Sequence, residues 1–503
     1  MPILSKSKFI SGIQCQKKLY FDFYRKDLKP PLTEAQKALF ASGHNVGELA
    51  QKVFPGGKDA TPDSYSNLSQ SIKLTADWIA VGIQTVYEAT FSANGAFCML
   101  DILHYQNGEC WAIEVKNSTS VKDYHITDGA FQYWVMDNCN YKPDKFFLMH
   151  INNQYVKDGA IEPKKLFHLE DITNQVISLQ EMVGEKKSEL QKILIQRDAT
   201  SGIPVRKEPE KEIGPHCGNP FECDYKAHCW QHVPDKSVFE LYRGSGWEWY
   251  EKGILKMEDI PEGVNLNTRQ QLQVNGVKDA AVHIETEQIK EFLNTWEYPL
   301  YFFDFETINP ALPYLDGTSP YQQVPFQYSL HFIAAPGAKP EHKAFLAQPE
   351  DYRETAVNDP TRALMDQIKQ DIGTEGSIVA YNASFEKRIL NFLGDRFPEE
   401  AAYIENLNSR FVDLLVPFRS GWYYRPEMNG SASIKAVLPA LVPEMSYSNL
   451  EINNGDMASS TFEQMIYQDH EDAGKIRQNL LKYCEQDTLA MVKIWERLLE
   501  EVE

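Results

Sequence analysis

The chain lacks long apolar segments and carries few cysteines. No stretch approaches the ~18 uninterrupted apolar residues of a membrane-spanning helix, and no signal-peptide-like apolar run follows the amino terminus. We therefore expect a cytoplasmic protein without a membrane partner. The eight cysteines are spread unevenly over 503 residues, which excludes the disulfide framework typical of small secreted proteins.

Positive charge is also scarce, because 50 Lys and Arg residues face 71 Asp and Glu residues, for a net charge of -21. Non-specific affinity for nucleic acid comes mainly from Lys and Arg that neutralise phosphates, so any nucleic-acid contact must be local. Two segments, 6–29 and 419–425, mix basic and aromatic residues that can pair with phosphates and stack on bases. For both segments, packing of the aromatic rings inside the fold is the alternative.

Carboxylates recur at the ends of predicted elements in the second half of the chain. Asp304 and Glu306 follow an apolar run, and a strand places residues i and i+2 on one face. Tyr483 and Asp487 lie one helical turn apart, and Glu386 lies near the start of a helix that follows a buried strand. Clustered carboxylates bind Mg²⁺ or Mn²⁺, and such cations activate water for attack on a phosphodiester. The pattern predicts a two-metal phosphodiesterase site.

These motifs resemble those of the DEDD exonucleases, in the branch whose last motif is Tyr-x-x-x-Asp. The resemblance implies an RNase H-like fold, 3′-to-5′ exonuclease activity, and a role for Tyr483 in orienting or deprotonating the attacking water. It also implies a set of four metal-binding carboxylates: Asp304, Glu306, Glu386 and Asp487. The middle motif of the family normally supplies Asp where this chain has Glu386, so Asp413 is an alternative donor.

The first half of the chain carries a different constellation. Residues 97–103 and 110–116 read as two strands joined at Asn107-Gly108, a strong hairpin signal. Glu114 and Lys116 share one face of the second strand, and pairing can bring Asp101 alongside. Two carboxylates then hold a cation while the ammonium steadies the attacking water or the developing charge. The alternative is an exposed strand with alternating charges.

This constellation resembles the PD-(D/E)XK nucleases. Three residues match the core motif: Asp101, Glu114 and Lys116. His44 lies in a segment that looks like the helical His motif of the RecB-like branch, which implies a further metal ligand. Gln132 lies where that branch has a Gln-x-x-x-Tyr helix, although Met136 occupies the Tyr position. Glu88 is another possible acidic contributor, or else an ordinary hydrogen-bonded strand residue.

Three cysteines recur in a loop interrupted by Gly and Pro that is suited to wrapping a metal centre: Cys217, Cys223 and Cys229. A fourth thiolate is needed for an all-cysteine site. The RecB-like iron-sulfur nucleases join one amino-terminal Cys to three later ones, so the resemblance implies that Cys15 completes a 4Fe-4S cluster. Zn²⁺ held with His216, His228 or Cys15 is one alternative, and unligated thiols are another. Cys98, Cys110 and Cys139 lie in or near apolar segments and are expected to be buried without a ligand, and packing is the expected role of Cys484 between Tyr483 and Asp487.

The length and the 43% hydrophobic content predict two or three globular domains, and the two nuclease resemblances imply an α/β fold class. We place a RecB-like PD-(D/E)XK nuclease domain at residues 1–235, a small helical connector at 236–295, and an RNase H-like exonuclease domain at 296–503. This order resembles bacterial proteins catalogued as domain of unknown function 2779. The resulting hypothesis is a metal-dependent nuclease, preferentially of DNA, in repair, recombination or defence. The alternatives are an RNA-processing exonuclease and a nucleic-acid-binding scaffold subunit with one inactive module.

Overall fold

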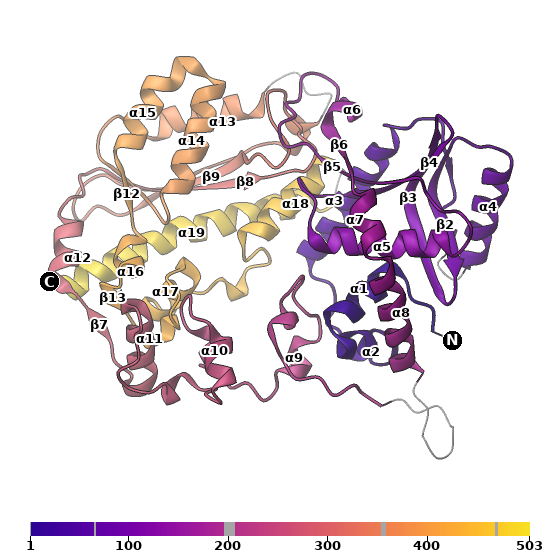
Figure 1. Cartoon of the computed structure of the whole chain (residues 1–503). Helices are drawn as coiled ribbons and strands as arrows, with labels where there is room; N and C mark the ends of the chain where they lie inside the picture. Colours follow the sequence, from indigo (N-terminus) through magenta and orange to yellow (C-terminus); the bar gives the residue numbers. More distant parts are fainter. Residues whose placement is uncertain (1, 65–66, 196–206, 354–358, 468–470) are drawn as a thin grey trace. The chain divides into compact units, whose positions relative to one another are not determined.

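The computed structural model describes residues 2–64, 67–195, 207–353, 359–467 and 471–503 (Figure 1). The chain divides into two compact units, Met1–His232 and Val233–Glu503. Each unit combines helices with its own sheet, which confirms the expected α/β class. The segment 236–295, for which we predicted a connector, belongs to the second unit. None of the helices in the described ranges combines the length and the apolar character needed to cross a membrane.

The first unit is built around a six-stranded sheet in the order β1-β2-β3-β4-β5-β6. Its strands are β1 (Lys58–Asp59), β2 (Thr85–Ala93), β3 (Ala96–Gln106), β4 (Glu109–Lys116), β5 (Lys145–Ile151) and β6 (Phe167–Asp171). Strands β3 and β4 pair antiparallel, and Asn107 and Gly108 between them both have positive φ, at 55° and 84°. This pairing confirms the predicted hairpin, whose turn requires the left-handed backbone that Asn and Gly tolerate.

Helices cover this sheet and join its strands. They are α1 (Lys6–Gln14), α2 (Gln16–Tyr24), α3 (Glu34–Gln51), α4 (Leu68–Ala80), α5 (Asp123–Asp137), α6 (Pro163–Leu166), α7 (Thr173–Ser178), α8 (Gln180–Leu194) and α9 (Lys226–Cys229), with short 3₁₀ turns at Lys26–Leu28 and Pro215–Cys217. Helix α5 crosses from β4 to the parallel strand β5. In the core, Phe9 of α1 stacks on Phe131 of α5 with ring centroids 4.7 Å apart, so the first helix is anchored beside the sheet.

The second unit is built around a five-stranded mixed sheet in the order β10-β9-β8-β11-β12, with a separate two-stranded ribbon of β7 and β13. Its strands are β7 (His283–Ile284), β8 (Leu300–Ile308), β9 (Val324–Ile333), β10 (Glu341–Leu346), β11 (Ser377–Ala380), β12 (Phe411–Asp413) and β13 (Tyr423–Tyr424). Strands β8, β11 and β12 run parallel, whereas β9 is antiparallel to β8 and β10.

Helices lie on both faces of this sheet, with α13, α14 and α15 on one face and α19 on the other (Figure 1). The helices of the unit are α10 (Gly246–Glu251), α11 (Thr268–Asp279), α12 (Thr286–Leu293), α13 (Pro360–Asp371), α14 (Ser384–Arg396), α15 (Ala401–Ser409), α16 (Val416–Arg419), α17 (Ile434–Leu441), α18 (Gly455–Tyr467) and α19 (Ala473–Val502). Short 3₁₀ turns lie at Val238–Glu240, Met257–Asp259, Pro349–Tyr352, Pro398–Glu400, Pro426–Met428 and Tyr447–Asn449.

The side chains of β8 alternate between the two faces of the sheet. Phe302 packs with Trp495 of α19, and Phe303 packs in the opposite cluster. Because the period of a strand is two residues, Asp304 and Glu306 share the face of Phe302. The apolar run therefore aims both carboxylates at the helix that carries the last motif.

Candidate functional site

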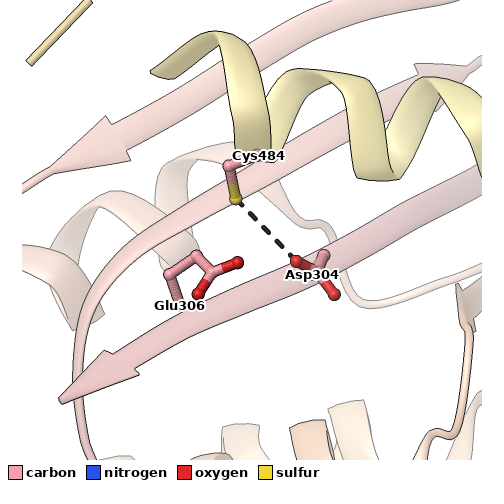
Figure 2. A group of neighbouring side chains, drawn as sticks. All are labelled: Asp304, Glu306 and Cys484. Atoms are coloured by element: carbon pink, nitrogen blue, oxygen red, sulfur yellow. Dashed lines mark hydrogen bonds between the residues drawn. The ribbon is translucent and has the colours of Figure 1, made fainter. Parts of the chain in front are cut away.

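Three side chains that can bind a metal meet in the second unit. A carboxylate oxygen of Asp304, one of Glu306 and the Sγ atom of Cys484 all lie within 4.8 Å of one another. Figure 2 shows Cys484 pointing from α19 toward the two carboxylates on β8. The Cys484 thiol donates to Asp304 Oδ2 across 3.8 Å. We use the name C-terminal acidic centre for the following set: Asp304, Glu306, Glu386, Cys484 and Asp487.

The position of Cys484 was missed in the sequence, where it was assigned to packing. Tyr483 and Asp487 lie on α19 as predicted, and both are buried. Cys484 precedes Asp487 by three residues, and positions i and i+3 share a helix face. The local spacing therefore contained the signal, which we did not use because the family motif leaves that position unspecified.

Glu386 reaches the centre from the first turn of α14. Before this helix, Asn382 adopts a left-handed backbone with φ of 76°, and its N–H donates to Asp413 Oδ1 at 2.9 Å. The same carboxylate oxygen accepts from the N–H of Leu415 at 3.1 Å. Asp413, which we considered as an alternative donor, therefore holds the turn that positions Glu386. The Glu386 side chain is buried, and its Oε2 atom has no hydrogen-bond partner among the described residues.

Burial raises the pKa values of all four carboxylates of the C-terminal acidic centre, and acidic neighbours in the centre add to the shifts of Asp304 and Glu306. Burial raises the pKa of Asp304 well above its usual range, and the charges of Asp487, Glu386 and Glu306 add to the effect. Burial also raises the pKa of Glu306, Glu386 (to about 8) and Asp487 (to about 6). Opposing influences include the Lys435 ammonium, which favours the charged forms of Glu306 and Asp487. The centre holds more negative charge than its neighbours neutralise, which suits a divalent cation.

The first unit also gathers the residues predicted for its site. The Glu114 carboxylate is almost completely buried, with 1% of its side chain exposed. Lys116 Nζ donates to Glu114 Oε1 at 2.7 Å, and Gln132 Nε2 donates to Oε2 at 2.8 Å. Asp101 Oδ2 accepts from the Val115 N–H at 2.6 Å on the neighbouring strand. We use the name N-terminal acidic centre for the set Glu88, Asp101, Glu114 and Lys116 together with Lys6.

Lys6 enters the N-terminal acidic centre from α1, and its ammonium forms an ion pair with Glu114. Helix α1 starts there because the Ser5 side chain caps it by accepting from the Lys8 N–H at 3.3 Å. In the sequence, Lys6 was assigned only to a basic and aromatic segment. The ion pair joins residues 108 positions apart, so no local pattern reveals it.

Two further carboxylates lie beside this ion pair, where the β2–β3 ladder is interrupted without a change of register. Glu88 has φ of 52° and is left out of the pairing, as is Asp101 opposite it. An open pocket of about 490 Å³ is lined by Ser5, Lys6, Glu88 and Asp101, among others. Burial raises the pKa of Glu88 to about 8 and that of Asp101 to about 7, and neighbouring carboxylates add to both shifts. The two carboxylates face a space that admits a cation or part of a substrate.

The pKa of Glu114 moves in the opposite direction. Burial alone would raise it, but the ammonium groups of Lys116 and Lys6 outweigh burial and hold the pKa below its ordinary value. Burial would lower the pKa of Lys116, but the carboxylates of Asp128 and Glu114 outweigh burial and raise it. In the described part of α3 the His44 side chain is 76% exposed, and its Nε2 atom lies 3.2 Å from Glu48 Oε1.

The four cysteines predicted to form a cluster line one small pocket of about 20 Å³: Cys15, Cys217, Cys223 and Cys229. Gln14 ties the amino-terminal helix to the late loop, because its Nε2 donates to the carbonyl oxygens of His216 at 2.9 Å and Phe221 at 2.6 Å. Tyr225 Oη donates to Asp22 Oδ1 at 2.9 Å. These bonds hold the thiols together across about 200 residues of sequence.

The two basic and aromatic segments pack their rings inside the fold. Phe9 and Phe21 are fully buried, as is Tyr423 in the second segment. Lys8 pairs with Asp22 at 3.2 Å, and Arg425 pairs with Glu501 at 2.7 Å. These contacts favour the packing interpretation over base stacking for both segments.

Comparison with known proteins identifies a partial family match. Residues 301–433 match the family model described as "Domain of unknown function (DUF2779)", so the expected resemblance holds for this part of the chain. The matched range includes Asp304, Glu306 and Glu386 but ends before α19.

Uncharacterised proteins of three mycoplasmas are similar to this chain. The protein from Mycoplasma pneumoniae is 26% identical over 38% of this chain and 31% of its own length. Relatives from Mycoplasma genitalium and Ureaplasma parvum are also 26% identical, over 41% and 38% of this chain and 33% and 30% of their own lengths. The chain thus spans about a third of these curated relatives. A solved structure titled "Crystal structure of SSO0001" matches 36% of this chain and 75% of its own, at 13% identity and a TM-score of 0.16, too low to support a conclusion about the fold.

Proposed function

We propose that the chain is a metal-dependent nuclease that hydrolyses phosphodiester bonds, with DNA as the preferred substrate. The observation that carries this proposal is the C-terminal acidic centre, where buried carboxylates from β8, α14 and α19 converge without enough positive charge to neutralise them. Such a set is costly in a folded protein unless a cation binds it. Phosphodiester hydrolysis is the chemistry that the DEDD resemblance assigns to it.

The residues of the centre divide into ligands and helpers. Four carboxylates would hold Mg²⁺ or Mn²⁺: Asp304, Glu306, Glu386 and Asp487. When bound, such ions activate water and stabilise the leaving oxygen. Tyr483 would orient the attacking water, and the Lys435 ammonium, which acts on Glu306 and Asp487, would limit the repulsion between the carboxylates. Glu386 is one methylene longer than the family's usual Asp, and its unpartnered Oε2 atom leaves it free to ligate.

The architecture of the second unit supports the RNase H-like fold implied by the same resemblance. A mixed sheet is flanked by helices on both faces, and the parallel strands β8 and β11 lie side by side. Strand β11 ends at Ala380, and the turn beyond it leads to Glu386. On β8, Asp304 lies two residues beyond Phe302, the last residue of this strand that pairs with β11. Open α/β sheets bind ligands outside the carboxyl ends of parallel strands, where this centre lies.

For the first unit we propose a RecB-like PD-(D/E)XK nuclease module. The meeting of Asp101, Glu114 and Lys116 at adjacent strands supports it. In this role Asp101 and Glu114 would hold the cation, and the Lys116 ammonium would stabilise the developing charge on the phosphate. Gln132 holds Glu114 in place through its 2.8 Å hydrogen bond.

We propose a 4Fe-4S cluster as the occupant of the cysteine pocket. A tetrahedral Zn²⁺ site with Zn–S bonds of about 2.3 Å places its thiolates about 4 Å apart. In the described residues, no three of these Sγ atoms lie within 4.8 Å of one another, although all four thiols line the pocket. A cubane cluster spreads its thiolates more widely, and it would link the two ends of the unit. Zn²⁺ is the alternative that metal analysis of anaerobically purified protein would detect.

The test of the nuclease proposal is incubation of the purified chain with end-labelled single- and double-stranded DNA and RNA, with Mg²⁺, Mn²⁺ or a chelator. We expect a stepwise 3′-to-5′ ladder that needs metal and disappears in Asp304→Asn. The matched control is Asp395→Asn, which changes an exposed carboxylate on α14. Absence of metal-dependent cleavage of all four substrates would overturn the proposal, and cleavage of RNA alone would favour RNA processing.

A second candidate for the first unit is a binding scaffold, which the internal ion pairs of Glu114 favour. Two ammonium groups and one amide already satisfy this carboxylate. A Glu114→Gln variant separates the two roles. Loss of one cleavage pattern, with the ladder from the C-terminal acidic centre intact, supports a second nuclease. If every product on every substrate persists, the scaffold role stands.

A further inference from the structure

Cys484 differs from the other potential ligands of the C-terminal acidic centre because it is a soft sulfur donor. It is the single cysteine of the sequence between residues 233 and 503. Its side chain is fully buried, and Figure 2 shows it turned toward Asp304 and Glu306. A thiol in ordinary packing would face apolar groups, whereas this thiol donates to a carboxylate oxygen at 3.8 Å.

We propose that Cys484 is a metal ligand, and that the C-terminal acidic centre binds a thiophilic divalent cation such as Co²⁺ or Zn²⁺ through one thiolate and two carboxylates. The inference rests on the proposed function in that it specifies the class of cation for the same centre. Mg²⁺ is ligated by oxygen, so it gains nothing from this side chain, whereas Zn²⁺ and Co²⁺ accept sulfur ligands.

The distances fit one ion in contact with all three groups. Tetrahedral coordination with Zn–S of about 2.3 Å and Zn–O of about 2.1 Å sets sulfur and oxygen about 3.6 Å apart. The Cys484 Sγ atom is 3.8 Å from Asp304 Oδ2, and the Glu306 oxygen lies within 4.8 Å of both. Movements of up to about 1.4 Å by the Glu306 side chain bring its oxygen into the same shell.

An independent observation also points to a cation. The buried Oε2 atom of Glu386 has no hydrogen-bond partner among the described residues, and its charge acts on both Asp304 and Glu306. An unpaired buried carboxylate oxygen whose charge acts on two of the three donors could supply a further ligand. On binding, the Cys484 S–H bond breaks, the sulfur–metal bond forms, and the proton passes to solvent, so no oxidant or reductant is needed.

The experiment is a Co²⁺ titration of the full-length, metal-free protein, followed by absorption spectroscopy. A thiolate ligand gives a sulfur-to-cobalt charge-transfer band, and this readout does not depend on nuclease activity. We expect a charge-transfer band in the spectrum of wild-type protein that is absent from the spectrum of Cys484→Ser. The affinity of this centre for Co²⁺ should fall at least about tenfold in the variant. Mg²⁺ affinity should stay unchanged.

Two further variants make the result independent of the folding of Cys484→Ser. Cys110→Ser changes a buried thiol of β4 in the first unit and should keep the band. Asp304→Asn retains Cys484 but removes a charged ligand, and it should weaken the same band. Identical spectra and Co²⁺ affinities in wild type, Cys484→Ser and Asp304→Asn would overturn the inference. A nuclease without the Cys484-dependent band contradicts this inference alone, whereas a band without cleavage of any substrate contradicts the proposed function alone.

Discussion

Glu114 and Glu386 are both almost completely buried, at 1% and 2% exposed, yet their pKa values move in opposite directions. The pKa of Glu114 is lowered, because the Lys116 and Lys6 ammonium groups outweigh burial. The pKa of Glu386 is raised to about 8 by burial and by the charge of Asp413. Equal burial with opposite shifts shows that the neighbours, rather than the depth, set the charge state of each carboxylate.

This contrast separates two ways to keep a carboxylate inside a protein. In the N-terminal acidic centre the chain provides its own cations, so Glu114 is already paired. In the C-terminal acidic centre the carboxylates of Asp304 and Glu306 are repelled by their acidic neighbours, and the metal ion that we propose would complete the charge balance. We therefore expect the stability of the C-terminal acidic centre to depend more strongly on added metal than that of Glu114.

The largest effect that we predict is on cleavage by the second unit. Asp304→Asn removes one ligand charge but keeps the shape of the side chain, so we expect the rate of stepwise digestion to fall by about 10³-fold or more, about 4 kcal/mol in activation free energy. Single-turnover kinetics on end-labelled DNA with Mn²⁺ measures this loss. The corresponding change in the first unit, Glu114→Gln, should leave the same rate unaltered, and an equal loss in both variants would contradict the independence of the two centres.

The next largest effect concerns the cysteine pocket, which belongs to the first unit. Cys223→Ala should remove the brown colour and the iron from anaerobically purified protein and lower the free energy of unfolding by about 3 kcal/mol, because the link between distant segments is lost. Iron analysis and chemical denaturation measure both changes. Stepwise digestion by the C-terminal acidic centre should persist, and unchanged iron content would contradict the ligand assignment.

Local periodicity was enough to predict the strand and helix that carry the C-terminal acidic centre. The alternation around Asp304 and Glu306 and the one-turn spacing of Tyr483 and Asp487 both follow from backbone geometry. The hairpin at Asn107-Gly108 was predictable for the same reason.

The features of the two centres that depend on contacts between distant segments were not predictable from the local sequence pattern. The ion pair of Lys6 with Glu114 and the use of Asp413 to hold the turn at Asn382 both arise only after folding. The role of His44 stays a prediction, because a helical motif alone does not determine which side of the helix faces the site, and this side chain is 76% exposed beside Glu48.

A smaller effect follows from the raised pKa of Glu386. Between its ordinary value of 4.5 and about 8, the folded state binds more protons than the unfolded state. The free energy of unfolding of metal-free protein should therefore fall as pH rises through this range. Glu386→Gln removes the charge, so it should stabilise metal-free protein at pH 8.5 and have little effect at pH 4.

Urea denaturation in the presence of a chelator, repeated across this pH range, measures the effect. Asp395→Asn on the same helix is the control, because this carboxylate is exposed and should not change the pH dependence. Added Mg²⁺ should stabilise wild type more than Glu386→Gln. If the variant keeps the pH dependence of wild type, Glu386 is not the group that titrates.

The smallest effect that we predict comes from a substitution that makes the N-terminal acidic centre more like the C-terminal one, by removing a cation from its carboxylate. Lys6→Met removes one of the two ammonium groups from Glu114, while Lys116 and Gln132 still bond to it, so we expect a loss of about 1 kcal/mol at pH 7. The lowered pKa of Glu114 stabilises the fold at pH values above the ordinary glutamate pKa of 4.5. The difference in stability between wild type and variant should therefore disappear as the pH falls through the lowered pKa. Mn²⁺ should restore the lost stability, since the ammonium no longer competes for the carboxylate.

The matched control is Lys8→Met, two residues further along α1. Both lysine side chains are 30% exposed and both form an ion pair, but Lys8 pairs with Asp22 and not with the N-terminal acidic centre. A cation in the first turn of a helix is unfavourable to the helix dipole, so Lys6 and Lys8 share that cost and differ in their partner. Thermal unfolding with and without Mn²⁺ should therefore show metal-dependent stabilisation that is larger in Lys6→Met than in Lys8→Met. Equal responses of the two variants to Mn²⁺ would mean that the Lys6 ammonium does not occupy the place of a metal ion at Glu114.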